Sequence, residues 1–120
     1  MARRFVLRLT HAADDVERVG AALTTGATAV ASGIQVELWL IHSAVVLATP
    51  GVLEGLELAH SPPLIELWNA IAAAGPIYAC TQCLLRRDIA ADSLREGVTQ
   101  AGAAVMVASL AEEGAISVDF

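Results

Sequence analysis

The chain has 120 residues, of which 56% are hydrophobic and 17% charged, so it can form a sizeable core and is not intrinsically disordered. The net charge is −6, and all seven basic residues are arginines. Because nucleic-acid binders carry a basic surface, we expect no nucleic-acid partner. Without a lysine, the chain has neither a Schiff-base lysine nor a P-loop lysine.

The sequence also lacks an apolar run of the roughly 18 residues that a membrane span requires. Arg8 interrupts the N-terminal stretch where a signal peptide needs continuous apolar residues. We therefore expect one cytoplasmic domain over residues 1–120, with no membrane partner. With so few charges, part of the surface must be apolar, and exposed apolar patches are usually partner surfaces. The composition thus predicts a homo-oligomer.

The first third of the chain alternates between strand and helix patterns. Arg4–Thr10 is strand-like, because apolar side chains alternate along it. Asp14 and Asp15 are suitable N-caps for a helix that continues to Val30 and ends at Gly33. Residues 34–41 form the next apolar run and are expected to be a strand.

The middle of the chain begins with a predicted helical turn at residues 44–48. Residues 49–63 contain two glycines and three prolines but also several leucines, which predicts a packed loop or lid. A helix is expected to begin at Pro62 or Pro63 and to stop at Gly75. Residues 76–81 then form the third predicted strand.

The last third contains three predicted elements. Ser93 and Glu96 have the spacing of a capping box, which predicts a helix continuing through Ala101. The apolar residues 103–110 are expected to be a fourth strand, and residues 116–120 a fifth of undetermined direction. Alternation of strands and helices predicts a three-layer α/β/α fold with a mostly parallel sheet of about five strands.

The polar groups with obvious chemistry follow three of the predicted strands. These groups are His11, His42 and the segment Cys80-Thr81-Gln82-Cys83. In open α/β sheets, ligands bind beyond the carboxyl ends of the strands. No glycine-rich fingerprint follows the first strand, so a dinucleotide is not indicated. We predict no cofactor and no metal.

The two cysteines are the strongest chemical signal in the sequence. A thiol at a strand-to-helix turn lies near unpaired backbone N–H groups, which stabilise the nucleophilic thiolate. Arg86 and Arg87 follow one turn later and are candidates to lower the thiol pKa or to bind an anionic sulfur group. Cys80 and Cys83 are therefore the candidate catalytic residues. The candidate binding residues are Arg86, Arg87, His11, His42 and Gln82.

Other interpretations of the cysteine spacing stay open. Free cysteines are often small buried hydrophobes. A structural zinc ion needs four ligands, which two cysteines and three scattered histidines supply only if subunits share a site. A thioredoxin-like pair is a further alternative, although the usual aromatic-Cys-Gly-Pro-Cys sequence is absent. The histidines are either general bases near the thiol or ordinary loop residues.

The order of these elements resembles the DsrE/DsrF/TusD-like family, which includes the YchN-like proteins. Residues 80–89, CTQCLLRRDI, match the family pattern of a Cys, five mostly small or apolar residues, then Arg-Arg or Arg-Gly and an aliphatic residue. Residues 94–102, LREGVTQAG, resemble its Leu-x-Glu-Gly-Val segment and the Gly that follows. A closing strand ending in Phe120 fits as well, so the resemblance covers nearly the whole chain.

The resemblance implies a sulfur relay. In sulfur-transferring members, the cysteine corresponding to Cys80 accepts sulfane sulfur as a persulfide and passes it to a partner. The family's usual trimers or hexamers agree with the predicted homo-oligomer. The chain departs from the pattern at Asp88, where Gly is common, at the extra thiol of Cys83, and at residues 42–45, which lack an Asp-Gly-Val-like turn.

Two functional hypotheses follow. In the first, the protein is a persulfide-carrying, sulfurtransferase-like protein served by sulfur donor and acceptor proteins. In the second, it is an oligomeric module that binds a small ligand or a protein without catalysis, and its cysteines are packing residues.

Overall fold

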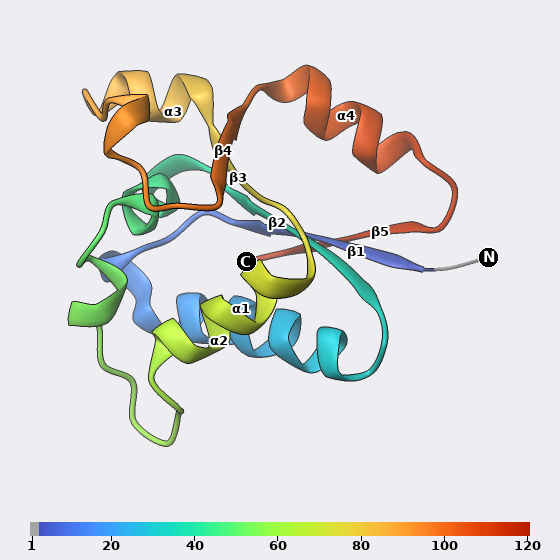
Figure 1. Cartoon of the computed structure of the whole chain (residues 1–120), viewed down its shortest axis with the longest axis horizontal. Coiled ribbons are helices and arrows are strands. Elements are labelled where there is room, and N and C mark those ends of the chain that lie inside the picture. The colour runs from blue at the N-terminus through green and yellow to red at the C-terminus, as the bar shows by residue number, and fades with distance from the viewer. Residues whose placement is uncertain (1–2) are drawn as a thin grey trace.

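A computed structural model describes residues 3–120, so residues 1 and 2 of the predicted domain lie outside the described residues. Its five strands form one parallel sheet in the order β4-β3-β2-β1-β5 (Figure 1). The strands are β1 (Arg4–Leu9), β2 (Gln35–Leu40), β3 (Ile77–Cys80), β4 (Val98–Ala101) and β5 (Ala115–Asp119). The undetermined direction of the last strand is thereby resolved, since β5 runs parallel to β1.

Helices cover both faces of this sheet. The two longest, α1 (Val16–Ala31) and α2 (Leu64–Ala74), pack together on one face. The shorter α3 (Thr81–Arg86) and α4 (Ala103–Ala111) lie on the other (Figure 1). The predicted α/β fold is confirmed. None of the helices in residues 3–120 has the length and apolar character needed to cross a bilayer.

The first helix begins and ends where its capping residues predict. The Asp15 carboxylate accepts a hydrogen bond from the backbone N–H of Arg18 at 3.2 Å, which satisfies one of the free donors of the first turn. Beyond the last turn, Gly33 has φ +78°, a conformation that glycine adopts without steric cost.

The middle of the chain is irregular but packed, as its leucines indicate. A 3-10 helix covers His42–Ala48 and a second covers Leu53–Gly55. Leu47 and Leu53 are fully buried. Helix α2 then starts directly after Pro63 and ends before Gly75.

The helix predicted from Ser93 to Ala101 is wrong. Ser93 ends a single 3-10 turn, Ala91–Ser93, and its hydroxyl donates to the Ala90 carbonyl. Gly97 has φ +90°, which no α-helix accommodates, and the chain turns there into β4. Capping-box spacing is a local signal, and here pairing of the next four residues with β3 prevailed.

The strand predicted at residues 103–110 is also wrong, because this segment lies within α4. An uninterrupted apolar run is compatible with a buried strand or a helix, and only its composition distinguishes them. Four of the nine residues of α4 are alanines, the strongest helix formers. Its apolar character does not reflect complete burial, since Val105 and Val107 are 45% and 60% exposed.

Side chains alternate across the sheet and build two unequal cores. Leu7 and Leu38 point toward α1 and α2 and belong to a cluster of 22 buried residues. Val6 and Trp39 point the other way and form, with Ala101, a cluster of only three buried residues beneath α4. The face with the smaller core carries the polar and reactive groups described next.

Candidate functional site

Cys80 is the last residue of β3 and the N-cap of α3. Its thiol is half-buried and accepts a hydrogen bond from the backbone N–H of Cys83 at 3.4 Å. Because the chain turns from strand to helix at this point, Cys83 falls in the first turn of α3 and projects back toward Cys80. The predicted placement of Cys80 at a turn from strand to helix is therefore found, and the helix begins at the next residue, Thr81.

The two sulfur atoms lie next to each other. Cys83 Sγ is 2.8 Å from Cys80 Sγ, and both cysteines are free thiols. Cys83 is buried, and its sulfur accepts a hydrogen bond from the backbone N–H of His42 at 3.3 Å. His42 follows β2 with φ +53°, a left-handed conformation that histidine tolerates better than most residues. Each sulfur thus accepts a hydrogen bond from the backbone, and the pair joins the carboxyl ends of β2 and β3.

Burial opposes ionisation of the first thiol. It raises the pKa of Cys80 above the ordinary cysteine value, and the adjacent Cys83 side chain raises it further. The backbone N–H of Cys83 acts in the opposite direction, but its effect is smaller. The direction of this shift is opposite to the stabilised thiolate that a strand-to-helix turn predicts at Cys80.

A pocket of about 320 Å³ opens directly over Cys80. Its floor comes from the carboxyl ends of β2, β3 and β4, and its wall from the start of α4. The lining residues are Trp39, Ile41, Cys80, Thr81, Gln82, Ala101, Gly102, Ala103 and Met106. Most of these side chains are apolar, and Cys83 is not among them. Cys80 thus presents its sulfur to a cavity suited to an apolar segment, while Cys83 lies behind it.

A buried polar network, which our sequence interpretation missed, holds one wall of this pocket. Glu37 is only 4% exposed and accepts hydrogen bonds from the indole N–H of Trp39 at 2.6 Å and from the hydroxyl of Ser109. Arg4 Nε lies 3.6 Å from Glu37, and the same guanidinium binds Glu112 at 2.7 Å. The network therefore ties α4 to the sheet and fixes the indole. A lone charged residue inside the apolar run VELWL was the available signal.

The other predicted site residues are only partly brought together. Gln82 lines the pocket, and His42 reaches Cys83 through its backbone rather than its imidazole. His11 lies at the end of β1 and pairs with Asp14 at 2.7 Å. Arg86 is exposed. Arg87 donates to the Cys83 carbonyl at 3.1 Å, so it caps α3.

Across residues 3–120, the hydrogen bonds and ion pairs found place neither of these guanidinium groups on a sulfur atom. The same residues contain no cluster of three or more His, Cys, Asp and Glu side chains that is suited to a metal ion.

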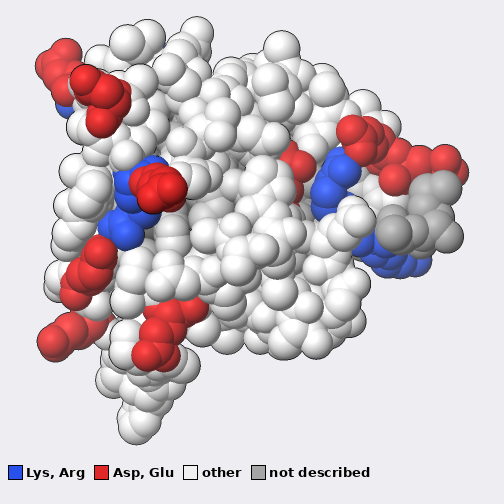
Figure 2. Space-filling view, in the orientation of Figure 1, with Lys and Arg blue, Asp and Glu red and all other residues white. Residues whose placement is uncertain are grey.

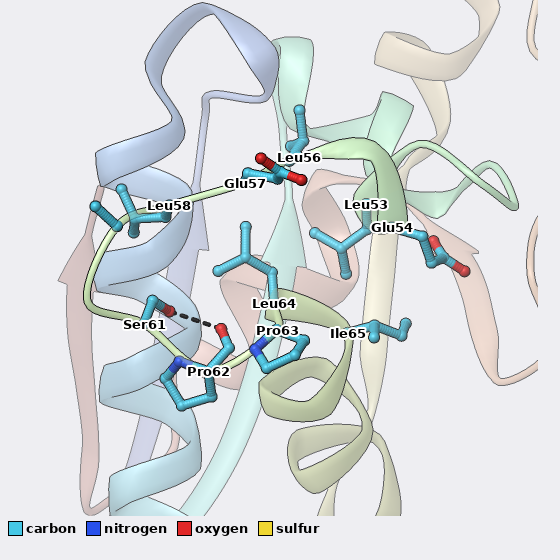
Figure 3. A pocket seen from close by; sticks show the side chains of 11 residues that line it. Leu53, Glu54, Leu56, Glu57, Leu58, Ser61, Pro62, Pro63, Leu64 and Ile65 are labelled. Carbon is cyan, nitrogen blue, oxygen red and sulfur yellow. Dashed lines mark hydrogen bonds between the residues drawn. The ribbon is translucent and has the colours of Figure 1, made fainter.

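A larger hollow of about 670 Å³ lies elsewhere and is lined by residues of the segment 53–65, which includes the start of α2 (Figure 3). Figure 3 shows leucine side chains around it, and the hydroxyl of Ser61 is bonded to the adjacent Pro62 carbonyl. At its rim, Glu54 pairs with Arg95 at 2.8 Å, which lowers the pKa of that carboxyl group. No cysteine lines this hollow, so the smaller pocket over Cys80 is the candidate functional site.

Known structures share this fold. The ychN protein from E. coli superimposes with a TM-score of 0.74 and 17% sequence identity, over 98% of this chain and 100% of that one. A protein of unknown function, MTH1491 from Methanobacterium thermoautotrophicum, gives a TM-score of 0.71 and 17% identity, over 98% of this chain and 99% of that one. At such identities the likeness concerns the fold alone.

The family assignment comes from the sequence. The model of the DsrE/DsrF-like family matches residues 4–116, and the chain belongs to that family. No curated protein matches the sequence of this chain.

Proposed function

We propose that this protein carries sulfane sulfur as a persulfide on Cys80 and delivers it to a partner protein. The observation that carries the proposal is the position of Cys80, whose sulfur forms part of an apolar pocket at the carboxyl end of the parallel sheet. Membership of a family generally related to sulfur relay supports the same conclusion.

Loading requires only a thiol and a persulfide donor. The Cys80 thiol gives up its proton, and its sulfur attacks the outer sulfur of the donor persulfide. A bond forms between Cys80 Sγ and that sulfur, the sulfur–sulfur bond of the donor breaks, and the donor leaves as a thiolate that takes up a proton. Oxidation state is conserved, since one persulfide is exchanged for another. The raised pKa keeps the resting thiol protonated, which protects it from oxidation, because the thiolate is the form that oxidants attack.

The pocket gives the bound sulfur an apolar environment and an entrance for the acceptor. Trp39 and Met106 line it, so a sulfur added to Cys80 has apolar neighbours. We infer that the acceptor presents its cysteine on an apolar segment that fits a cavity of about 320 Å³.

Single-cysteine variants test the proposal. Cys83→Ser and Cys80→Ser are each incubated with inorganic polysulfide, freed from excess reagent, and weighed by intact-protein mass spectrometry. Cys83→Ser should gain the mass of one sulfur atom, which a dithiol reductant removes. Cys80→Ser should stay unmodified, because its remaining cysteine is buried. Loading of Cys80→Ser, or of neither variant, would contradict the proposal.

A second candidate function is a binding module without catalysis, in which the pocket holds an apolar ligand. The burial of Cys83 favours this alternative, because free cysteines often serve as small core hydrophobes. Reactivity of the folded protein toward iodoacetamide separates the two. Alkylation of Cys80 in the native state supports the carrier, and protection of both thiols until denaturation supports the module.

We also propose that copies of this chain associate through the α4 side. Figure 2 shows charged side chains gathered toward the two ends of the molecule, with an uncharged surface over α4 between them. Val107→Asp should reduce the molar mass measured by light scattering, whereas Thr24→Asp on the exposed surface of α1 should leave it unchanged. Equal masses for both variants would count against this interface. A cytoplasmic location completes the proposal, because the relay needs reduced thiols.

A further inference from the structure

The arrangement of the two sulfur atoms suggests an outcome beyond storage and delivery. We propose that Cys83 discharges the Cys80 persulfide as sulfide, leaving an internal Cys80–Cys83 disulfide that a dithiol reductant must reopen. This inference rests on the proposed function, since it needs sulfur on Cys80. It makes the acceptor of the relay optional, because the protein itself then converts sulfane sulfur to sulfide.

The distance between the thiols favours this reaction. Cys83 Sγ lies 2.8 Å from Cys80 Sγ, and a disulfide bond of about 2.05 Å requires less than 1 Å of further approach. The two residues are three apart at the start of a helix, so a small side-chain rotation closes the gap. No rearrangement of the sheet is involved.

The surroundings of the sulfurs also favour the required direction of attack. Thiol–disulfide exchange proceeds with the incoming sulfur, the attacked sulfur and the leaving sulfur roughly in line. Cys80 lines the pocket and Cys83 does not, so a sulfur added to Cys80 extends into the pocket, away from Cys83. Cys83 therefore faces the inner sulfur of the persulfide from the side opposite the leaving group.

The backbone supplies a donor for the attacking group. The N–H of His42 donates to Cys83 Sγ at 3.3 Å and stabilises negative charge on that sulfur as its proton leaves. Cys80 has a backbone donor of its own, the N–H of Cys83. The roles of the two thiols follow from their access: Cys80 lines the pocket and is loaded, and the buried Cys83 acts as the resolving nucleophile.

The step balances in atoms and electrons. The Cys83 thiolate forms a bond to Cys80 Sγ, the bond between Cys80 Sγ and the outer sulfur breaks, and hydrosulfide leaves with the electron pair. The outer sulfur is reduced to sulfide while the two cysteine sulfurs are oxidised to the disulfide. A second reaction, with a small or protein dithiol as reductant, restores both thiols.

The experiment compares the wild type with Cys83→Ser after loading with inorganic polysulfide and removal of excess reagent. The wild type should be recovered two hydrogen atoms lighter, with one sulfide released per chain. Cys83→Ser should retain the added sulfur and release no sulfide. A wild-type sample without polysulfide should keep both thiols, which excludes oxidation by air. Dithiothreitol should return the wild type to its original mass.

The other outcomes separate the inference from the function on which it rests. If the wild type and Cys83→Ser keep the persulfide equally long, the inference fails and the carrier function stands. If discharge accelerates with protein concentration, attack comes from another molecule and the inference fails. If neither chain loads nor releases sulfide, the carrier function itself fails. Cys83→Ala is measured in parallel, so that misfolding of one variant does not decide the result.

Discussion

The two faces of the sheet differ in how they are covered. Helices α1 and α2 cover one face, where 22 buried residues, including Leu23 and Ile71, form a continuous core. On the other face, α4 covers a cluster of only three buried hydrophobic residues, with half-buried side chains such as Tyr78 around them. The buried side chains of α3, Cys83 and Leu84, belong to the larger cluster. The face covered by α4 also holds the buried Glu37, the thiol of Cys80 and the pocket.

This difference suggests that one face mainly stabilises the fold and that the other gives a substrate access to the thiol. Burial of apolar surface stabilises the fold roughly in proportion to area, so most of the stability comes from the α1 and α2 face. A reactive thiol needs space for a substrate, and a thin layer of helices provides it. If so, substitutions on the two faces should differ in their effects on stability and on the reactivity of the thiol.

The largest expected effect concerns matched leucines on the two faces. Leu23→Ala removes a fully buried side chain from the inner side of α1 and should lower the free energy of unfolding by about 2–5 kcal/mol. Leu85→Ala on α3, where the leucine is 69% exposed, should change it by no more than about 0.5 kcal/mol. Urea unfolding at one protein concentration measures both. Similar losses would show that the exposed Leu85 is packed as tightly as Leu23 and would contradict this difference.

The polar network beneath α4 gives the next largest effect. Glu37→Ala leaves the indole N–H of Trp39 and the hydroxyl of Ser109 without their acceptor and should cost about 1–3 kcal/mol. Because α4 and Trp39 both border the pocket, native-state alkylation of Cys80 should also become faster. Glu37→Gln keeps an acceptor and should have smaller effects on both measurements. An unchanged alkylation rate in Glu37→Ala would mean that the network does not control access.

The elements on the face covered by α1 and α2 were predicted better than those around the pocket. Periodicity and capping residues identified α1 and β2, because their burial imposes regular patterns on the sequence. The segment 91–111 was assigned the wrong way round, since α4 is apolar on its exposed side and β4 has only four residues. The position of Cys80 after a strand followed from spacing. The sequence also placed His42 and the cysteines at the same edge of the sheet. It did not predict the backbone contact of His42 with Cys83, because that contact joins residues about 40 positions apart, nor did it predict the pocket.

The pH dependence of thiol reactivity compares Cys80 with an ordinary cysteine. Burial and Cys83 raise its folded-state pKa, so iodoacetamide should react with it at higher pH than with a free cysteine. Removing the neighbouring thiol in Cys83→Ala should shift the profile to lower pH, and Cys80→Ser should show no native-state reaction.

The same shift affects stability. Because the folded state holds the proton more tightly, the contribution of Cys80 is fully present below the unfolded pKa and is lost as pH rises through the folded one. If iodoacetamide reacts with Cys80 at the same pH as with free cysteine, or at a lower pH, burial is not the main influence on the pKa of this thiol.

The smallest expected effect lies at the end of α3, where the chain departs from the family pattern. Asp88 has φ +53°, a left-handed conformation that costs most residues about 1–2 kcal/mol and glycine almost nothing. Aspartate tolerates this conformation better than most residues. Asp88→Gly should therefore raise the free energy of unfolding by no more than about 1 kcal/mol, since the added flexibility of the unfolded chain offsets part of the gain.

Asp92→Gly, in the nearby 3-10 turn, relieves no such strain and should not stabilise the protein. A destabilised Asp88→Gly variant would show that the Asp88 side chain contributes more than its backbone conformation costs.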